Sequence, residues 1–185
     1  MTEVDLKIKI KKTAVDHFNK HGYHGATIRN IANDVGCSLP MVYYYYQSKK
    51  ELFHEIIKKD YFDLLNKQAS RLETKNILDF YTAFVCKVSE LDEYDKKVYR
   101  LGVKVYLSFD GDDELMDLMD KWEKSIYPRH YELVMPHLKG TNKAPVVVRT
   151  LIHLLENLIE SIVVKNRCLT EQDIREELAI VLGGT

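Results

Sequence analysis

The sequence is short of cysteine, proline and glycine, and it has no long apolar run. Its 185 residues include only 3 Cys, 4 Pro and 8 Gly, and no low-complexity linker separates its parts. No apolar stretch approaches the roughly 20 residues of a membrane span. The first residues, MTEVDLKIKIKK, also lack the apolar segment of a signal peptide. We therefore expect a cytoplasmic protein without a membrane partner.

Catalytic and metal-binding motifs are also missing. The three cysteines stand far apart and are odd in number: Cys37, Cys86 and Cys168. Because they show no ligand spacing, we expect buried free thiols. His17 and His21 stand i, i+4 with His24 close by, but no carboxylate or thiol completes a zinc pattern. With no glycine-rich phosphate loop and no nucleophile elbow, the sequence predicts no enzyme, no cofactor and no metal site.

Tyrosine is abundant, and charge is unevenly distributed. There are 12 Tyr, and the net charge of the whole chain is −1. Residues 1–50 hold eight Lys and Arg against four Asp and Glu, a net charge of +4. Residues 51–185 hold nineteen against twenty-four, a net charge of −5. A basic N-terminal part on an acidic body indicates a polyanionic partner for the first part.

Helix signals dominate, and no alternating strand pattern or internal repeat is visible. Residues 3–21 carry apolar side chains at helical spacing and end at Gly22. Short helices are expected over 28–35, capped by Thr27, and over 39–46, capped by Ser38. The segment SKKE, residues 48–51, is a capping-box pattern that opens a longer helix to residue 72.

The rest of the chain is also expected to be helical. The predicted helices are 75–91, 93–109, 112–138 with an interruption near Pro128, 145–166 with Pro145 in its first turn, and a last one from Thr170 to Gly183.

The two short helices have the spacing of a helix-turn-helix unit. Ala32 is the small residue that a close crossing needs, and Gly36 is a residue suited to a left-handed turn. Further residues should point inward from both helices and the turn between them: Ile28, Ile31, Val35, Cys37, Val42 and Tyr45 or Tyr46.

The second short helix should expose an apolar, almost uncharged face: Ser38, Leu39, Met41, Tyr43 and Tyr44. A solvated face would normally carry Lys and Glu. Hydroxyl and apolar groups can instead contact base edges and thymine methyl groups in the major groove. Lys49, Thr27 and the free N–H groups at the helix starts are expected at phosphates.

Residues 8–53, IKIKKTAVDHFNKHGYHGATIRNIANDVGCSLPMVYYYYQSKKELF, resemble the DNA-binding domain of the TetR family of bacterial transcriptional regulators. The matching features are F…GY after the first helix, T.R.IA…G.S across the second, and VYYYYQSKKELF at and after the third. The resemblance implies an all-α fold, in which an N-terminal three-helix helix-turn-helix domain, residues 1–47, joins a C-terminal bundle, residues 48–185, for ligand sensing and dimerisation. It also implies a sequence-specific regulator, a ligand-released repressor that binds a palindromic double-stranded DNA operator as a homodimer.

The resemblance assigns different roles to the four consecutive tyrosines. Tyr43 and Tyr44 match positions of DNA-backbone contacts, with Tyr44 also able to touch a base, and Tyr45 matches a position near a phosphate. Tyr46 replaces the usual phenylalanine and should pack inside. The complete set of expected DNA contacts is Thr27, Arg29, Ser38, Leu39, Pro40, Met41, Tyr43, Tyr44, Tyr45 and Lys49.

Residues 146–164 are too apolar for a helix with one buried face. Twelve of these nineteen residues are apolar, whereas one face needs about three in seven. The excess indicates a second face against the domain core or a partner, and a four-helix interface between two subunits would use it. The candidate interface residues are Leu151, Leu155, Leu158, Ile162, Ile174 and Leu178.

Aromatic and methionine side chains of the central helices are candidates for an effector pocket, although such residues at helical spacing are more often core. The candidates are Tyr81, Phe84, Tyr99, Tyr106, Phe109, Met116, Met119 and Trp122. They identify no ligand class. A co-repressor type of regulator, a DNA binder without any effector, and a helical protein or enzyme with a fortuitous N-terminal motif remain alternatives.

Overall fold

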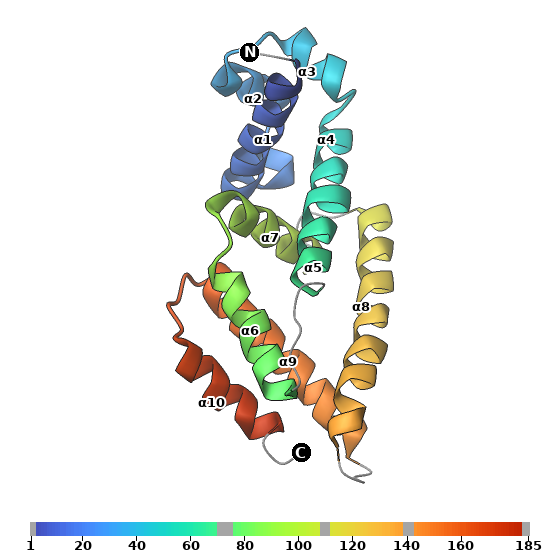
Figure 1. Cartoon of the computed structure of the whole chain (residues 1–185). Coiled ribbons are helices and arrows are strands. Elements are labelled where there is room, and N and C mark those ends of the chain that lie inside the picture. Colours follow the sequence, from blue (N-terminus) through green and yellow to red (C-terminus); the bar gives the residue numbers. More distant parts are fainter. Residues whose placement is uncertain (1–2, 70–75, 108–111, 139–142, 183–185) are drawn as a thin grey trace. The chain divides into compact units, whose positions relative to one another are not determined.

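The computed structural model describes residues 3–69, 76–107, 112–138 and 143–182, and these residues form helices without any strand (Figure 1). The elements in chain order are α1 (Glu3–Gly25), α2 (Ile28–Val35), α3 (Leu39–Tyr45), α4 (Lys49–Glu55), the π-helical turn η1 (Ile56–Tyr61), α5 (Phe62–Ala69), α6 (Ile77–Ser89), α7 (Glu93–Tyr106), α8 (Asp113–Val134), the 3₁₀ turn η2 (Met135–His137), α9 (Ala144–Val163) and α10 (Glu171–Leu182). The predicted all-α class is confirmed. No helix within the described ranges is long and apolar enough to cross a membrane.

Packing divides the chain into two compact units. The first lies within Met1–Leu65 and Asp92–Asp117, and the second within Asn66–Leu91 and Leu118–Thr185. The first unit therefore contains α1 to α4, η1 and α7, and the second contains α6, α9, α10 and most of α8. The predicted division into a DNA-binding domain, residues 1–47, and a ligand-binding and dimerisation domain, residues 48–185, stays a prediction.

Helix α1 supports the first unit, because it packs against α2, α4 and α7. Ile10 and Phe18 on this helix are fully buried, and the Phe18 ring meets the edge of Phe53 with the ring centroids 4.9 Å apart. Each such side chain contributes about 1.5–3 kcal/mol by burial. The helical run breaks at Gly22, whose φ of 70° is left-handed, so the predicted glycine stop is confirmed.

Two of the three predicted caps at the N-terminal helices are confirmed. The backbone N–H of Asn30 donates to the Thr27 hydroxyl over 3.2 Å, and the N–H of Glu51 donates to the Ser48 hydroxyl over 3.0 Å. The Ser38 side chain makes no capping hydrogen bond, so that expectation is wrong. Proline in the first turn of α3 favours helical φ there without such a cap.

The long helix predicted after Ser48 is interrupted by a π-helical turn, which no sequence signal indicated. Within this turn, the Asp60 carboxylate accepts hydrogen bonds from the Lys11 ammonium over 2.7 Å and from the Tyr94 hydroxyl over 2.6 Å. The ring of Tyr61 lies against Gly102 so closely that a Cβ atom at residue 102 would overlap it. These contacts join η1 to α1 and α7.

In the second unit, α6, α9 and α10 pack against one another. The predicted interruption near Pro128 is wrong, because α8 is continuous through this proline. The predicted cap at Thr170 is confirmed, since its hydroxyl accepts from the N–H of Asp173 over 3.1 Å. Between α6 and α8, the Tyr81 hydroxyl is 2.7 Å from His130 Nδ1.

The three cysteines are free thiols, as expected, but none of them is fully buried. Cys37 and Cys86 are half-buried, and Cys168, in the segment between α9 and α10, is exposed. The expectation of burial is therefore wrong for Cys168 and only partly met for the other two.

Candidate nucleic-acid interface

Helices α2 and α3 form a helix-turn-helix unit in which the expected turn residues have the expected roles. Gly36 is left-handed, with φ 76° and ψ 35°, and its N–H donates to the carbonyls of Ala32 and Asn33 over 3.0 Å each. A residue with a Cβ is strained in this conformation. Ala32 is buried where α2 meets its neighbours, as the close crossing requires.

Helix α3 presents an unusual outer surface. Val42 and, just after the helix, Tyr46 are fully buried, which confirms the prediction that Tyr46 packs inside. On the outer side, Met41 is 36% exposed, Tyr43 45% and Tyr44 70%. The helix thus shows aromatic and thioether groups to its surroundings with no acidic or basic side chain among them, so its exposed face is suited to contacts with base edges and sugars.

Tyr45 differs from the expected phosphate contact. Its side chain is half-buried, and its hydroxyl is shielded from solvent without a hydrogen-bond partner among the described residues. Burial accordingly raises the pKa of the Tyr45 hydroxyl. In this conformation Tyr45 contributes packing at the base of α3, and its hydroxyl is not available to a phosphate.

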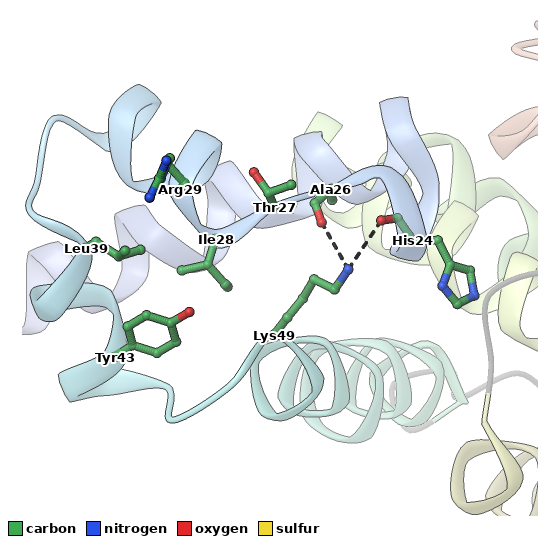
Figure 2. Close-up of a pocket in the computed structure, with 8 residues that line it drawn as sticks. All are labelled: His24, Ala26, Thr27, Ile28, Arg29, Leu39, Tyr43 and Lys49. Atoms are coloured by element: carbon green, nitrogen blue, oxygen red, sulfur yellow. Dashed lines mark hydrogen bonds between the residues drawn. The ribbon is translucent and has the colours of Figure 1, made fainter.

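An open pocket of about 380 Å³ lies beside the start of α2, and residues of α3 and α4 line its other sides (Figure 2). Its eight lining residues are His24, Ala26, Thr27, Ile28, Arg29, Leu39, Tyr43 and Lys49. None of them is acidic, and several can donate hydrogen bonds. The first N–H groups of a helix such as α2 have no partner within the helix, and the positive end of the helix dipole favours an anion there. The pocket is therefore suited to a phosphate group.

The structure brings five of the ten predicted DNA contacts to this pocket: Thr27, Arg29, Leu39, Tyr43 and Lys49. Ser38, Pro40, Met41 and Tyr44 are exposed outside its lining. The sequence reasoning missed His24, Ala26 and Ile28 as lining residues. His24 could have been recognised from its place just before the Thr27 cap, whereas the buried Ala26 and Ile28 carry no polar signal.

The side chain of Lys49 is occupied by protein acceptors. Its ammonium donates to the carbonyls of Tyr23 over 2.7 Å, Ala26 over 3.1 Å and His24 over 3.4 Å. It also lies 4.5 Å from the centroid of the Tyr23 ring. Figure 2 shows the lysine extending from the start of α4 to the loop between α1 and α2, with two of these hydrogen bonds dashed.

The predicted effector-pocket residues are not gathered in one unit. Tyr81, Phe84, Met119 and Trp122 belong to the second unit, while Tyr99, Tyr106 and Met116 belong to the first. Phe109 lies outside the described residues. Tyr81 and Met119 are buried, which is equally consistent with a core role.

The six predicted dimer-interface residues are all buried within a single chain: Leu151, Leu155, Leu158, Ile162, Ile174 and Leu178. They form the core in which α6, α9 and α10 pack. Their role at a subunit interface stays a prediction. The sequence showed an excess of apolar residues but not which of the two faces meets the chain's own core.

Comparison with known proteins connects these features to a family. Residues 10–56 match the family model described as bacterial regulatory proteins, tetR family. The biofilm operon icaADBC HTH-type negative transcriptional regulator IcaR of Staphylococcus aureus is 28% identical over 90 residues, which are 46% of this chain and 48% of IcaR. An HTH-type transcriptional repressor of Streptomyces coelicolor is 38% identical over 58 residues, 31% of this chain and 30% of that protein. The chain thus aligns with about half or less of these relatives' length.

Solved structures extend the likeness to nearly the whole chain. A TetR-like transcriptional regulator from Rhodococcus sp. RHA1 has a TM-score of 0.70 at 16% identity, covering 97% of this chain and 94% of that one. A transcriptional regulator from Aquifex aeolicus VF5 has a TM-score of 0.69 at 20% identity, covering 96% and 98%. At these identities the likeness shows the fold alone.

Fold and site define a helix-turn-helix protein with a helical C-terminal part. Its helix-turn-helix part, residues 10–56, matches the TetR family.

Proposed function

We propose that this protein is a sequence-specific DNA-binding transcriptional regulator, a cytoplasmic repressor without enzymatic activity. The observation that carries the proposal is the exposed face of α3, where Met41, Tyr43 and Tyr44 are exposed while Val42 and Tyr46 are buried. A side-chain pattern that keeps uncharged aromatic groups at the surface is costly unless a partner covers them. The major groove of DNA is such a partner. The pocket at the start of α2, next to this face, can hold a backbone phosphate.

The protein is proposed to act as a homodimer on a palindromic operator. Two copies of α3 related by two-fold symmetry would occupy successive major grooves about 34–36 Å apart. Support for self-association comes from apolar residues of α9 and α10 that the chain does not bury: Val146 is 54% exposed and Ile180 84%. Ile180 is the most exposed large apolar side chain among the described residues.

The dimer is tested by sedimentation of the wild type and of Ile180→Glu. Because Ile180 has almost no contact with its own chain, a charge there leaves the fold intact and opposes only a subunit contact. We expect the wild type to be a dimer and the variant to be a monomer. The variant should still be folded, which a thermal melt checks. A variant that stays dimeric would place the interface elsewhere.

We further propose that an unidentified small-molecule effector releases the protein from DNA. Such release requires that the effector bind the DNA-free conformation more tightly, and the operator must then weaken effector binding by the same factor. A thermal-shift screen of metabolites identifies a candidate, and its affinity is then measured with and without operator. Tighter binding on DNA would indicate a co-repressor, and equal binding would remove an effector role for that compound.

The DNA-binding proposal itself is tested by selection from a random duplex pool, followed by anisotropy with the selected sequence. We expect one palindromic motif, bound about 10³-fold or more tightly than unrelated DNA at physiological salt. Thr27→Ala, which removes the cap of α2, should weaken binding. Failure to enrich any sequence would contradict the proposal.

A further inference from the structure

The position of Lys49 at the edge of the phosphate pocket makes it look like a phosphate ligand, but its contacts assign it another task. An ammonium group has three N–H donors. Three backbone carbonyls, those of Tyr23, His24 and Ala26, lie at hydrogen-bond distances of 2.7, 3.4 and 3.1 Å from Nζ. The donor capacity of Lys49 is therefore fully used within the chain.

The three carbonyls belong to the end of α1 and to the loop that leads into α2. The carbonyls at a helix end lack partners within the helix and carry partial negative charge. Helix α1 is also broken at Gly22, so its last turn depends on contacts from outside the helix. A lysine near such an end can satisfy its carbonyls and neutralise the negative end of the dipole.

The same contacts fix the residue that caps α2. Ala26 directly precedes Thr27, and Ala26 is almost fully buried. By holding the Ala26 carbonyl, Lys49 fixes the backbone at the point where the Thr27 hydroxyl accepts from Asn30. It also masks carbonyl oxygens that would repel an incoming phosphate. To bind a phosphate itself, the ammonium would have to leave these carbonyls beside the new anion.

We infer that Lys49 is a positioning residue, which holds the α1–α2 loop so that the start of α2 can receive a phosphate, and that it is not itself a phosphate ligand. This role rests on the proposed DNA-binding function. It differs from the direct phosphate contact that the sequence predicted for this lysine.

The test uses Lys49→Met, which keeps the apolar stem and removes the donors. Lys50→Met is the matched control, since it removes one positive charge from the same helical turn, where Lys50 pairs with Asp112 over 2.8 Å. Hydrogen exchange of residues 22–31 is measured in the free full-length proteins. The salt dependence of binding to the selected operator is then measured for each.

For Lys49→Met we expect exchange of residues 22–31 at least tenfold faster than in the wild type, weaker DNA binding at every salt concentration, and an unchanged slope of log K against log salt. Loss of a direct phosphate contact would instead lower that slope by about 0.9. A lowered slope, or exchange as slow as in the wild type, would overturn the inference. The Lys50→Met control should exchange like the wild type over this segment.

If Lys49→Met does not fold, Lys49→Gln is used, because its amide can still donate to part of the carbonyl set, and the same slope criterion applies. If the wild type binds no DNA, the proposed function fails. The exchange measurement on the free protein still decides whether Lys49 holds the loop.

Discussion

The hydroxyl of Tyr46 provides a stability test of the packing beneath α3. This side chain is fully buried, and its hydroxyl has no hydrogen-bond partner among the described residues. Burial raises the pKa of this hydroxyl, with the carboxylates of Glu55, Asp60 and Glu51 adding to the effect. A buried polar group without a partner costs about 1–3 kcal/mol. Tyr46→Phe removes that cost and keeps the ring over which the Lys7 ammonium lies, 5.3 Å from its centroid.

Part of this gain is lost because the deleted oxygen leaves a small gap in the packing. We therefore expect Tyr46→Phe to raise the free energy of unfolding by about 1 kcal/mol, which corresponds to roughly 2–4 °C in Tm for a chain of this size. DNA affinity should stay within about twofold, because the hydroxyl does not reach the surface. Thermal melts followed by circular dichroism measure the first quantity, and anisotropy measures the second.

Tyr43→Phe is the control: its hydroxyl is removed from an exposed side chain, so Tm stays constant while DNA affinity falls. If Tyr46→Phe destabilised the protein by about 1 kcal/mol or abolished binding, the hydroxyl would have a partner and the reasoning would be wrong.

Gly102→Ala should destabilise the protein by about 1–3 kcal/mol, because its Cβ overlaps the Tyr61 ring, and Tyr61→Ala in the same chain should recover part of that loss in urea denaturation. Additive losses in the double variant would contradict this contact. Burial lowers the pKa of His130 from 6.5 to about 4, with Arg129 adding to the effect, so between these values the unfolded chain binds the proton and the folded chain does not. Stability should therefore fall as the pH is lowered from about 6.5 to about 4. In His130→Gln, Tm should fall less steeply over the same pH range. Parallel curves of Tm against pH for the wild type and the variant would exclude His130 as the cause. Leu39→Ala or Met41→Ala should change tolerance at particular operator base pairs by about 1–3 kcal/mol, measured on a substitution library, whereas a uniform loss would argue against base contact.

The features that sequence could predict are those set by local signals. Gly36, Thr27 and the Ser48 capping box each act within a few residues, so the helix-turn-helix unit and most helix boundaries could be predicted from them. The contacts of Lys49 could not, because they depend on how the start of α4 meets carbonyls more than twenty residues earlier in the chain.

Where a helix has more than one apolar side, helical periodicity also could not show which side packs into the chain's own core. Leu151 and Ile174 stand at spacings that suit a subunit interface or a chain's own core equally well, and the structure buries them in the core. The hydroxyls of Tyr45 and Tyr46 show the same limit at smaller scale. Residue type gives the polarity of a tyrosine, but only the packing around α3 decides that both hydroxyls are shielded.

The central claim is that the exposed tyrosine face of α3 contacts the DNA bases of an operator, and site-specific photocrosslinking tests it most directly. The photoreactive residue p-benzoylphenylalanine replaces Tyr44, which is 70% exposed on α3, or Leu133, which is 43% exposed on α8 and serves as the control. With the selected operator, the account predicts crosslinks from position 44 to one or two adjacent positions in each half-site, lost on competition with unlabelled operator, and none from position 133. Crosslinks from position 44 that are absent, or scattered evenly along the duplex, would contradict it.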